Sequence, residues 1–463
     1  MFVAASLSLL LAAVPQAQGG GKPILNARDQ KTLADKLKKY LAAEIAYDQA
    51  EGRAREKTGK ARRKAKEAFN DAWENAEKKG EVLGSMADLN AIYHNCFTPK
   101  KPSHGKGKLY PQSMGSGSDM KWGIFVPKKY REKSPWPAIV ALPDGESGTW
   151  VKPAEHFKNT WEGSPMMASH VVHIPVIPQG LELDPVPDYS KDGAEKDEDS
   201  RNRTVLGTLG FVLNNYNIER DQVFLDCGRE ACGYGMRLAS LFPDRFAGIV
   251  LRDAVAVDEL RLGALSNLPI LMLKSADNAQ AVDALKVRLD ESCPGMATVI
   301  DAKGAAPHLD SAADILAWMS EQKRVMAPSK VVLEPNHDRF KKAYWVNIHV
   351  AESLLTTTGD DQPRLEVEAD REQNRITVEA KSVERFELLL NDDLVDLSKE
   401  FTIVVNGRAV QETRRRSFRD MHNRMVTRND WGYLFPVRYV TTVPKEADKE
   451  SAEDKGADDK APE

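Results

Sequence analysis

A series of short apolar runs, each long enough for one buried strand, constrains the fold of this chain more than any other feature. The runs are Trp122–Pro127, Pro137–Pro143, Val171–Pro178, Val223–Asp226, Ala247–Asp253, Pro269–Asp277 and Thr298–Gly304. Segments with helical periodicity follow the later runs. Strands that alternate with helices form a mostly parallel sheet, and a strand buried on both faces is apolar throughout. The sequence therefore predicts an α/β domain over residues 121–325, with helices on both faces of the sheet.

The regions on either side of this domain have different patterns. Apolar residues recur every four positions from Leu33 to Ile45, which predicts an N-terminal helical hairpin over residues 26–95. Short strands separated by turn residues predict a small β-sandwich-like, C-terminal β-rich domain over residues 331–442. Residues 443–463 contain mostly Lys, Glu, Asp and Ala without apolar periodicity, which predicts a disordered charged tail.

The first twenty residues have the pattern of a signal peptide. Phe2–Val14 is an apolar run, and Ala17–Gly19 offers a small-x-small cleavage site. The alternative is a plain apolar strand at the N-terminus. We expect a signal peptide over residues 1–20 and a secreted or periplasmic protein, with no transmembrane segment, because no other stretch reaches the length of a membrane-spanning helix.

Composition excludes some classes of function. The net charge of the 463 residues is −4, so no global basic field favours nucleic acid. Cys96, Cys227, Cys232 and Cys293 allow three disulfide pairings or none, and the sequence does not choose among them. No CxxC spacing occurs, so we expect no zinc site, and we expect no metal and no cofactor.

The stretch CGREACGYG, Cys227–Gly235, lies between a predicted strand and a predicted helix. A G-x-nucleophile-x-G turn in this context is tight, so the residues two before and two after the nucleophile must be small. Only Glu230 has this frame, with Gly228 before it and Cys232 after it. The sequence therefore places a glutamate where the usual residue is serine.

Residues 121–324 resemble the secreted bacterial esterase and polymer-depolymerase branch of the α/β-hydrolase superfamily. The resemblance is carried by WGIFVPKKYREKSPWPAIVALPDG, DQVFLDCGREACGYGMRLASLFPDRFAGIVLRDA, PILMLKSADNAQAV and AKGAAPHLDSAADILAWM. It covers under half of the chain and implies the α/β-hydrolase fold. It also implies a catalytic set in the family's order, with Glu230 in the nucleophile position, Asp277 as the acid and His308 as the base. Asp253, which also ends a strand, is a weaker rival for the acid.

The chain departs from the family at the groups that stabilise the transition state. The resemblance implies an oxyanion pocket at Asp144, Gly145 and Ala231, but a carboxylate at Asp144 would repel a developing oxyanion. A carboxylate nucleophile is known in the superfamily as Asp. Glu230 is one methylene longer, so its oxygen is displaced by about 1 Å, which can cost roughly a hundredfold in rate.

Three hypotheses of function follow. The first is a catalytically impaired or inactive homologue, a pseudoenzyme, that serves as a binding scaffold in the cell envelope. The second is an active hydrolase that uses Glu230 with the Asp277/His308 pair on an ester, amide or epoxide-like bond of a small or polymeric substrate. The third is an envelope interaction protein that binds an extracellular protein or polysaccharide through its β-rich domain.

Aromatic residues of the C-terminal domain bear on the third hypothesis. Tyr344, Trp345 and Trp431 can form a carbohydrate-stacking face, although aromatic residues of this kind are more often part of a core.

Overall fold

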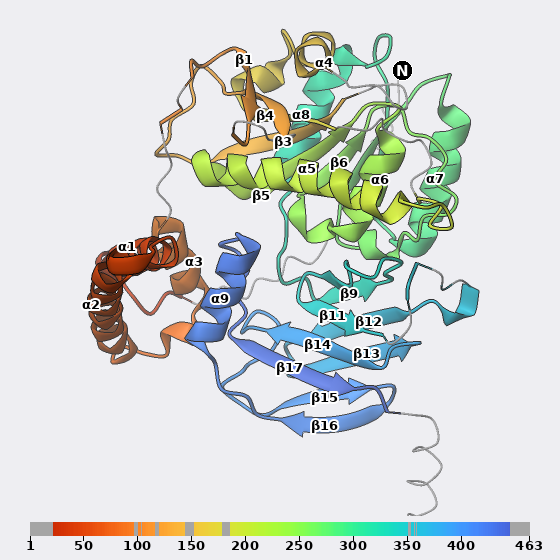
Figure 1. The fold of residues 1–463 in the computed structure, drawn as a ribbon. Helices are drawn as coiled ribbons and strands as arrows, with labels where there is room; N and C mark the ends of the chain where they lie inside the picture. The colour runs from red at the N-terminus through yellow and green to blue at the C-terminus, as the bar shows by residue number, and fades with distance from the viewer. Residues whose placement is uncertain are drawn as a thin grey trace, which may run out of the picture.

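The computed structural model describes residues 22–96, 101–102, 104–115, 120–143, 152–177, 186–350, 353–355, 357 and 359–444. The predicted signal peptide, Asp144, Gly145 and all but the first two residues of the predicted tail lie outside these ranges. Figure 1 shows three parts: N-terminal helices, a central α/β sheet and a C-terminal β-rich module.

The central sheet has eight strands in the order β1-β2-β4-β3-β5-β6-β7-β8. Strand β2 is antiparallel to both of its neighbours, and β4, β3, β5, β6, β7 and β8 are parallel to one another. The strands are β1 Leu109–Ser113, β2 Lys121–Phe125, β3 Trp136–Leu142, β4 Val171–Val176, β5 Ile218–Cys227, β6 Gly248–Leu251, β7 Ile270–Lys274 and β8 Ala297–Asp301. This is the architecture of the α/β-hydrolase fold, with the elbow turn directly after β5, so the predicted fold class is confirmed.

Helices cover both faces of this sheet because the central strands are apolar on both sides. Neighbouring residues of β5 alternate between the two cores: Leu225 packs in one core and Phe224 in the other. Helices α5 (Ala194–Asn215), α6 (Cys232–Leu241) and α7 (Ala279–Ser292) contribute to the first core, and α4 (Pro153–Thr160) and α8 (Ala312–Glu321) to the second. The arrangement holds the turn between β5 and α6 at the carboxyl edge of the sheet.

The C-terminal module is built from two sheets that enclose one core. The first sheet has the order β10-β11-β14-β17 and the second β16-β15-β13-β12-β9. The strands are β9 Lys330–Leu333, β10 Lys342–Ala343, β11 Val346–His349, β12 Arg364–Asp370, β13 Arg375–Lys381, β14 Arg385–Leu390, β15 Phe401–Val405, β16 Arg408–Glu412 and β17 Val437–Thr442. Tyr344 and Trp345 are buried in the core between them, so neither offers a stacking face.

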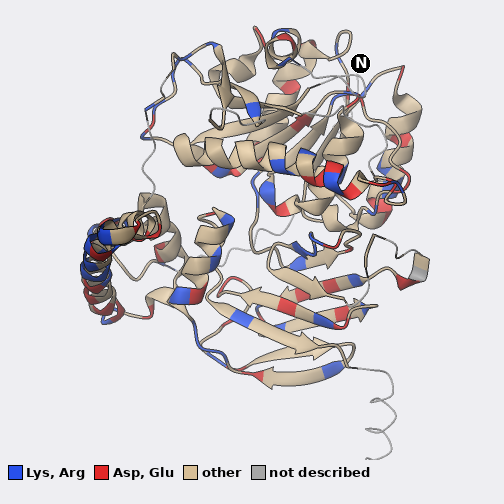
Figure 2. Ribbon diagram, in the orientation of Figure 1, with Lys and Arg blue, Asp and Glu red and all other residues tan. Residues whose placement is uncertain are grey.

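The N-terminal part consists of α1 (Ala27–Asp48), α2 (Gly52–Glu77) and α3 (Met86–Cys96). Its core contains Leu33, Leu37 and Phe69, and it is completed from the far end of the chain by helix α9 (Phe418–Arg428). Figure 1 shows α9 beside these helices. Figure 2 shows acidic as well as basic residues along α1 and α2, which is typical of a solvated helical surface.

All four cysteines fall within the described residues, where each side chain is buried and none forms a disulfide. None of the described helices has the length and apolar character that crossing a membrane requires.

Candidate active site

The elbow turn connects the end of β5 at Cys227 to the start of α6 at Cys232. Glu230 lies in this turn and is half-buried. A nucleophile elbow is a strained turn, and strain of this kind places a residue in a sparsely populated backbone region. Yet the described residues with positive φ include neither Glu230 nor Gly228. The turn therefore has the position of a nucleophile elbow without a left-handed residue at Glu230.

The backbone N–H of Ala231 is the donor that the resemblance assigns to the oxyanion pocket. Ala231 is fully buried, and its N–H donates to the carbonyl of Gly228 at 3.2 Å. A donor that already bonds a carbonyl is not preorganised for a developing oxyanion. Asp144 and Gly145, the other two predicted pocket residues, lie outside the described residues.

His308 lies in the loop after β8, as predicted, and its side chain is buried. Its backbone is left-handed, with φ 60° and ψ 47°. The ring Nδ1 is 3.1 Å from the carbonyl oxygen of Gly304, and the ring Nε2 is buried without a hydrogen-bond partner among the described residues. A backbone carbonyl accepts from Nδ1–H, which leaves the lone pair on Nε2. The ring is therefore in the tautomer of a general base, but a peptide group orients it rather than a carboxylate.

Asp277 follows β7, as predicted, but its side chain is exposed. Among the described residues it makes neither a hydrogen bond nor an ion pair, so no such contact links it to His308. The neighbouring Asn278 is buried instead. Its amide nitrogen donates to Asp253 Oδ1 at 2.8 Å and to the carbonyl of Leu273 at 2.9 Å. The buried side chain after β7 is therefore the amide of Asn278 and not the carboxylate of Asp277.

Asp253, the rival for the acid, is buried after β6. Besides the bond from Asn278, its Oδ2 lies 3.6 Å from Arg229 Nη1, next to the elbow residue. The carboxylate therefore pairs with a cation of the elbow turn and not with His308. Among the described residues, none of the three predicted catalytic side chains contacts another through a hydrogen bond or ion pair.

A buried ion pair that the sequence reasoning missed lies beneath this region. Arg252 Nε donates to Asp226 Oδ1 at 2.7 Å, with both side chains at most 1% exposed. Arg252 also donates to the carbonyl of Pro307 at 3.0 Å, which ties the end of β6 to the histidine loop. Burial raises the pKa of Asp226, and Arg252 opposes this shift without cancelling it. The sequence feature that could have predicted this ion pair is a charged residue at the end of each of two apolar runs, Asp226 in VFLD and Arg252 in IVLRD.

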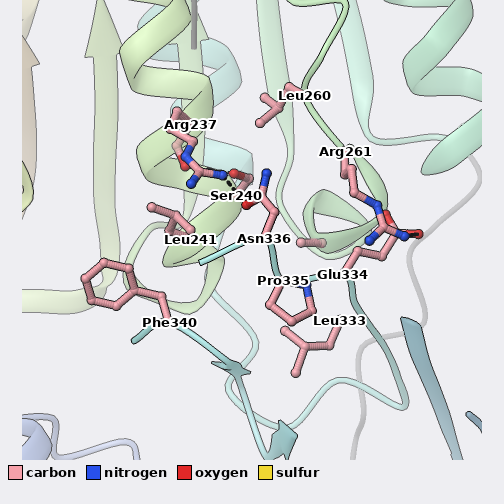
Figure 3. Close-up of a pocket in the computed structure, with 11 residues that line it drawn as sticks. Arg237, Ser240, Leu241, Leu260, Arg261, Leu333, Glu334, Pro335, Asn336 and Phe340 are labelled. Atoms are coloured by element: carbon pink, nitrogen blue, oxygen red, sulfur yellow. Dashed lines mark hydrogen bonds and ion pairs between the residues drawn. The ribbon is translucent and has the colours of Figure 1, made fainter. Parts of the chain in front are cut away.

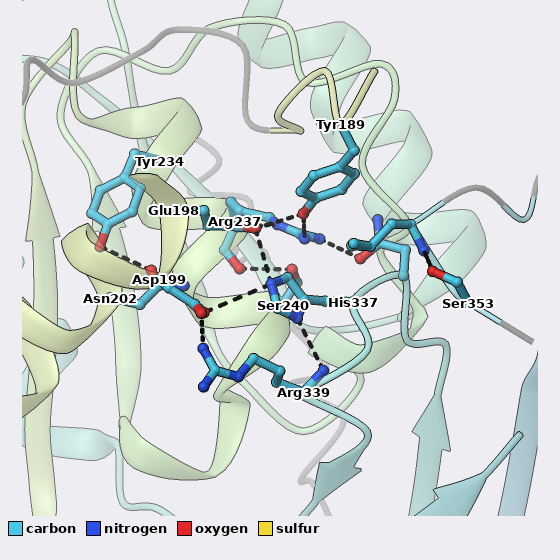
Figure 4. Close-up of polar contacts among 12 residues, drawn as sticks. Tyr189, Glu198, Asp199, Asn202, Tyr234, Arg237, Ser240, His337, Arg339 and Ser353 are labelled. Carbon is cyan, nitrogen blue, oxygen red and sulfur yellow. Dashed lines mark hydrogen bonds and ion pairs between the residues drawn. The ribbon is translucent and has the colours of Figure 1, made fainter. Parts of the chain in front are cut away.

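Helix α6, which begins at the elbow, is fixed by a second buried polar network (Figure 4). Arg237 on α6 donates to Glu198 Oε1 of α5 at 2.7 Å and to the Tyr189 hydroxyl at 2.7 Å. His337, from the loop between β9 and β10 of the C-terminal module, is fully buried with its Nε2 3.6 Å from Glu198 Oε2. These contacts attach the helix after the elbow to the C-terminal module.

A small cavity lies beside this network, between Arg237 and Leu241 of α6 and Glu334, Asn336 and Phe340 (Figure 3). Its volume of about 10 Å³ is close to the space that one water needs. Among the described residues, no group of three or more His, Cys, Asp and Glu side chains is placed to hold a metal ion.

No protein-family model and no curated protein matches this chain. A thermostable esterase is 16% identical with a TM-score of 0.37; the alignment covers 47% of this chain and 63% of the esterase, under two thirds of its length. A CE1 ferulic acid esterase of Anaeromyces mucronatus is 12% identical, with a TM-score of 0.33 over 49% of this chain and 94% of that one. The S-formylglutathione hydrolase of Staphylococcus aureus is 15% identical, with a TM-score of 0.34 over 47% and 99%. The fold assignment rests on the strand order, and these similarities add nothing about activity.

Proposed function

We propose that this protein is an α/β-hydrolase-fold pseudoenzyme that serves as a binding scaffold. The observation that carries the proposal is the orientation of His308, whose Nδ1 bonds the Gly304 carbonyl while Asp277 is exposed. A triad base needs a carboxylate at Nδ1, because the carboxylate stabilises the imidazolium that forms when the base takes a proton. A neutral carbonyl orients the ring but gives the developing positive charge far less stabilisation.

Two further features act in the same direction. The Ala231 N–H is used within the turn, so one oxyanion donor is occupied. Loss of a single donor of this kind costs about 10²–10³ in rate. Glu230 also lacks the left-handed backbone that would strain the turn. Because these changes affect the base, the oxyanion pocket and the nucleophile separately, restoring one residue leaves the other two unchanged.

An active hydrolase is the second candidate, and one observation favours it. His308 Nε2 is buried and has no partner among the described residues, so it is available to accept a proton or to activate water. In this mechanism the Glu230 carboxylate bonds to the acyl or epoxide carbon as the C–O or C–N bond to the leaving alcohol or amine breaks, or as the epoxide C–O bond opens. Water activated by His308 then hydrolyses the covalent intermediate.

Hydrolysis of short-chain and aryl nitrophenyl esters by the purified protein tests the proposal. We expect wild type, His308→Ala and Glu230→Ser to hydrolyse these esters no faster than buffer alone does. His349→Ala, a histidine change on β11, is the matched control. Turnover by wild type that His308→Ala abolishes and His349→Ala preserves would show the active hydrolase instead. Activity that appears only in Glu230→Ser would show an intact site disarmed at one position.

Export is also proposed, on the basis of the N-terminal sequence. We propose cleavage after Ala17-Gln18-Gly19 and a secreted or periplasmic scaffold whose partner is an envelope or extracellular protein or polysaccharide. N-terminal sequencing of protein recovered outside the cytoplasm should begin near Gly20. Recovery of the intact N-terminus in the cytoplasm alone would contradict this proposal.

A further inference from the structure

A cluster of arginines surrounds a cavity at the opposite end of β5 from the elbow. The cavity has a volume of about 150 Å³ and lies among α5, the start of β5 and the C-terminal end of α9. Its polar lining consists of Arg220, Arg245, Arg324, Arg428, Asn429 and Asp430, and we call this group the arginine pocket. The remaining wall is formed by Leu206, Leu209, Gly210 and Leu213 of α5 and by Val223 of β5. Arg220 and Glu230 are ten positions apart, at opposite ends of the strand, so the pocket is remote from the candidate active site.

Two of the four arginines have carboxylate partners. Arg324 binds Asp430 through two nitrogens at 2.6 and 3.0 Å and also contacts Asp221 at 2.8 Å. Arg428 lies 2.5 Å from Asp244 Oδ2. Neither Arg220 nor Arg245 has a carboxylate oxygen within ion-pair distance among the described residues. The lining of the pocket therefore contains more positive than negative charge.

The unpaired arginines also have a structural role. Arg220 donates to the carbonyls of Asn429 and, at 3.2 Å, of Leu213, and Arg245 donates to the carbonyl of Arg428 at 3.1 Å. These bonds satisfy carbonyls at the C-terminal ends of α9 and α5, where a cation is favourable. They do not exhaust a guanidinium group, which has five N–H donors. In addition, Arg428 Nε is buried and has no hydrogen-bond partner among the described residues.

Holding unpaired cations here is costly. Burial lowers the pKa of Arg220 and that of Arg245 to about 10; the neighbouring arginines add to this shift, and the nearby carboxylates oppose it without cancelling it. A cation removed from water is stabilised by an anion that accepts its hydrogen bonds. The pocket therefore has the charge, the donors and the space for an anion.

The pocket adjoins a larger cavity of about 450 Å³ that shares Leu213, Arg220 and Arg324 with it. Its other walls come from α3, from the start of β5 and from Trp431. The Arg220 guanidinium lies 5.2 Å from the centre of the Trp431 ring, and Trp431 Nε1 is buried without a partner among the described residues. The three parts of the molecule thus meet around one continuous polar and aromatic site.

We propose that this site binds a small molecule carrying a phosphate or sulfate group, with the oxyanion in the arginine pocket and the remainder against Trp431. A tetrahedral oxyanion presents several acceptor oxygens in different directions, which suits guanidinium donors that converge from β5, from the turn after α6, from the loop after α8 and from α9. This function is independent of ester chemistry, because it uses none of the residues at the elbow.

The test uses the full chain with inorganic phosphate and inorganic sulfate as probes, against sodium chloride at equal ionic strength. We expect phosphate or sulfate to raise the melting temperature saturably and to give a calorimetric binding isotherm. Arg220→Gln and Arg245→Gln should each raise the dissociation constant at least tenfold. Arg63→Gln, which changes an exposed arginine of α2, is the matched control and should bind as wild type does.

Two outcomes would overturn the proposal: no saturable effect of either oxyanion beyond that of chloride, or equal binding by wild type and Arg220→Gln. If both glutamine variants fail to fold, hydrogen exchange of wild type decides. Phosphate should then protect the amides of residues 428–432, and unchanged exchange there counts against the site. Glu230→Ser should bind phosphate normally, which separates this result from the fate of the pseudoenzyme proposal.

Discussion

The two ends of strand β5 differ in how their polar groups are satisfied. At the carboxyl end, no hydrogen bond or ion pair among the described residues links Glu230, Asp277 and His308, and backbone carbonyls accept from Ala231 and His308. At the amino end, four buried or half-buried arginines line one cavity, and Arg428 Nε has no hydrogen-bond partner among the described residues. A family resemblance directs attention to the first end, whereas the arginines without a carboxylate partner are at the second. Groups held at a cost are better candidates for function than groups that are locally satisfied.

Two buried aspartates show how the two ends of β5 differ in their effect on a carboxylate. Asp226 near the elbow and Asp430 in the arginine pocket are both buried and both paired with a buried arginine. Burial raises the pKa of Asp226, whose Oδ2 has no hydrogen-bond partner among the described residues. Burial acts on Asp430 too, but Arg324, Arg428 and Arg220 outweigh it and hold its pKa below the ordinary value. An ionised aspartate is thus destabilised by burial near the elbow and strongly stabilised in the arginine pocket.

The largest effect is expected from Arg324→Met. Arg324 is 3% exposed and holds Asp430, so its loss leaves a buried carboxylate without its main partner. We expect the free energy of unfolding to fall by about 3–5 kcal/mol, measured by urea denaturation. Arg63→Met on the exposed face of α2 should stay within about 0.5 kcal/mol of wild type. If both variants lost the same free energy of unfolding, Arg324 would contribute no more to stability than an exposed arginine.

The next comparison is Asp430→Asn against Asp226→Asn. At pH 7 we expect Asp430→Asn to lose about 1–3 kcal/mol more, because it leaves several arginine donors without an acceptor. The depressed pKa of Asp430 contributes stability above its ordinary pKa that is lost as the pH falls towards its folded value. Asp226 has the opposite sign, since its raised pKa makes ionisation a cost to the fold as the pH rises. The difference between the variants should therefore shrink at about pH 3, as measured by urea denaturation at both pH values.

A steric prediction concerns the elbow end. A Cβ added at Gly235 would overlap the Cys227 side chain on β5, so Gly235→Ala must push α6 away from the strand. Forcing a methyl group into a packed core costs about 1–3 kcal/mol. Thermal denaturation should show a lower melting temperature. An unchanged value would mean that the turn between β5 and α6 adapts more easily than its packing indicates.

The smallest effect has the opposite sign. Gly210 lies inside α5, and a Cβ added there meets no atom within 4 Å. Replacing a glycine in a helix interior by alanine stabilises by about 0.5–1 kcal/mol. Gly210→Ala should therefore raise the melting temperature slightly, and a decrease would reveal a contact in the arginine pocket that the added methyl disturbs.

Much of the fold could be predicted because its signals are local. The short strands predicted in residues 331–442 include RLEVEAD, which forms β12, and the Asn406-Gly407 turn joins β15 to β16 with φ values of 46° and 83°, which suits a hairpin turn. Helix α9 was missed, because RRRSFRDMHNRMVTRND has few apolar residues and reads as a polar linker. Its helical character becomes evident only when Met421 and Met425 contact the N-terminal helices.

The sites were less predictable because their residues meet only in three dimensions. The elbow position of Glu230 follows from spacing, but whether a carboxylate reaches His308 depends on which of Asp277 and Asn278 points inward. The arginine pocket draws on α5, β5, α9 and two loops, and more than 200 residues separate Arg220 from the Asn429 carbonyl that it binds. No local pattern brings such residues together, and only their separate positions at the ends of apolar segments hinted at burial.

The shared core of the N-terminal helices and α9 has a consequence for how the chain is made. The Tyr93 hydroxyl lies 3.0 Å from His422 Nδ1, a residue 329 positions later. During synthesis, α1, α2 and α3 therefore emerge long before the residues that cover their inner face. Until then an apolar surface is open to other nascent chains, the kind of exposure that chaperones shield. The end of the polypeptide thus decides whether its beginning stays soluble.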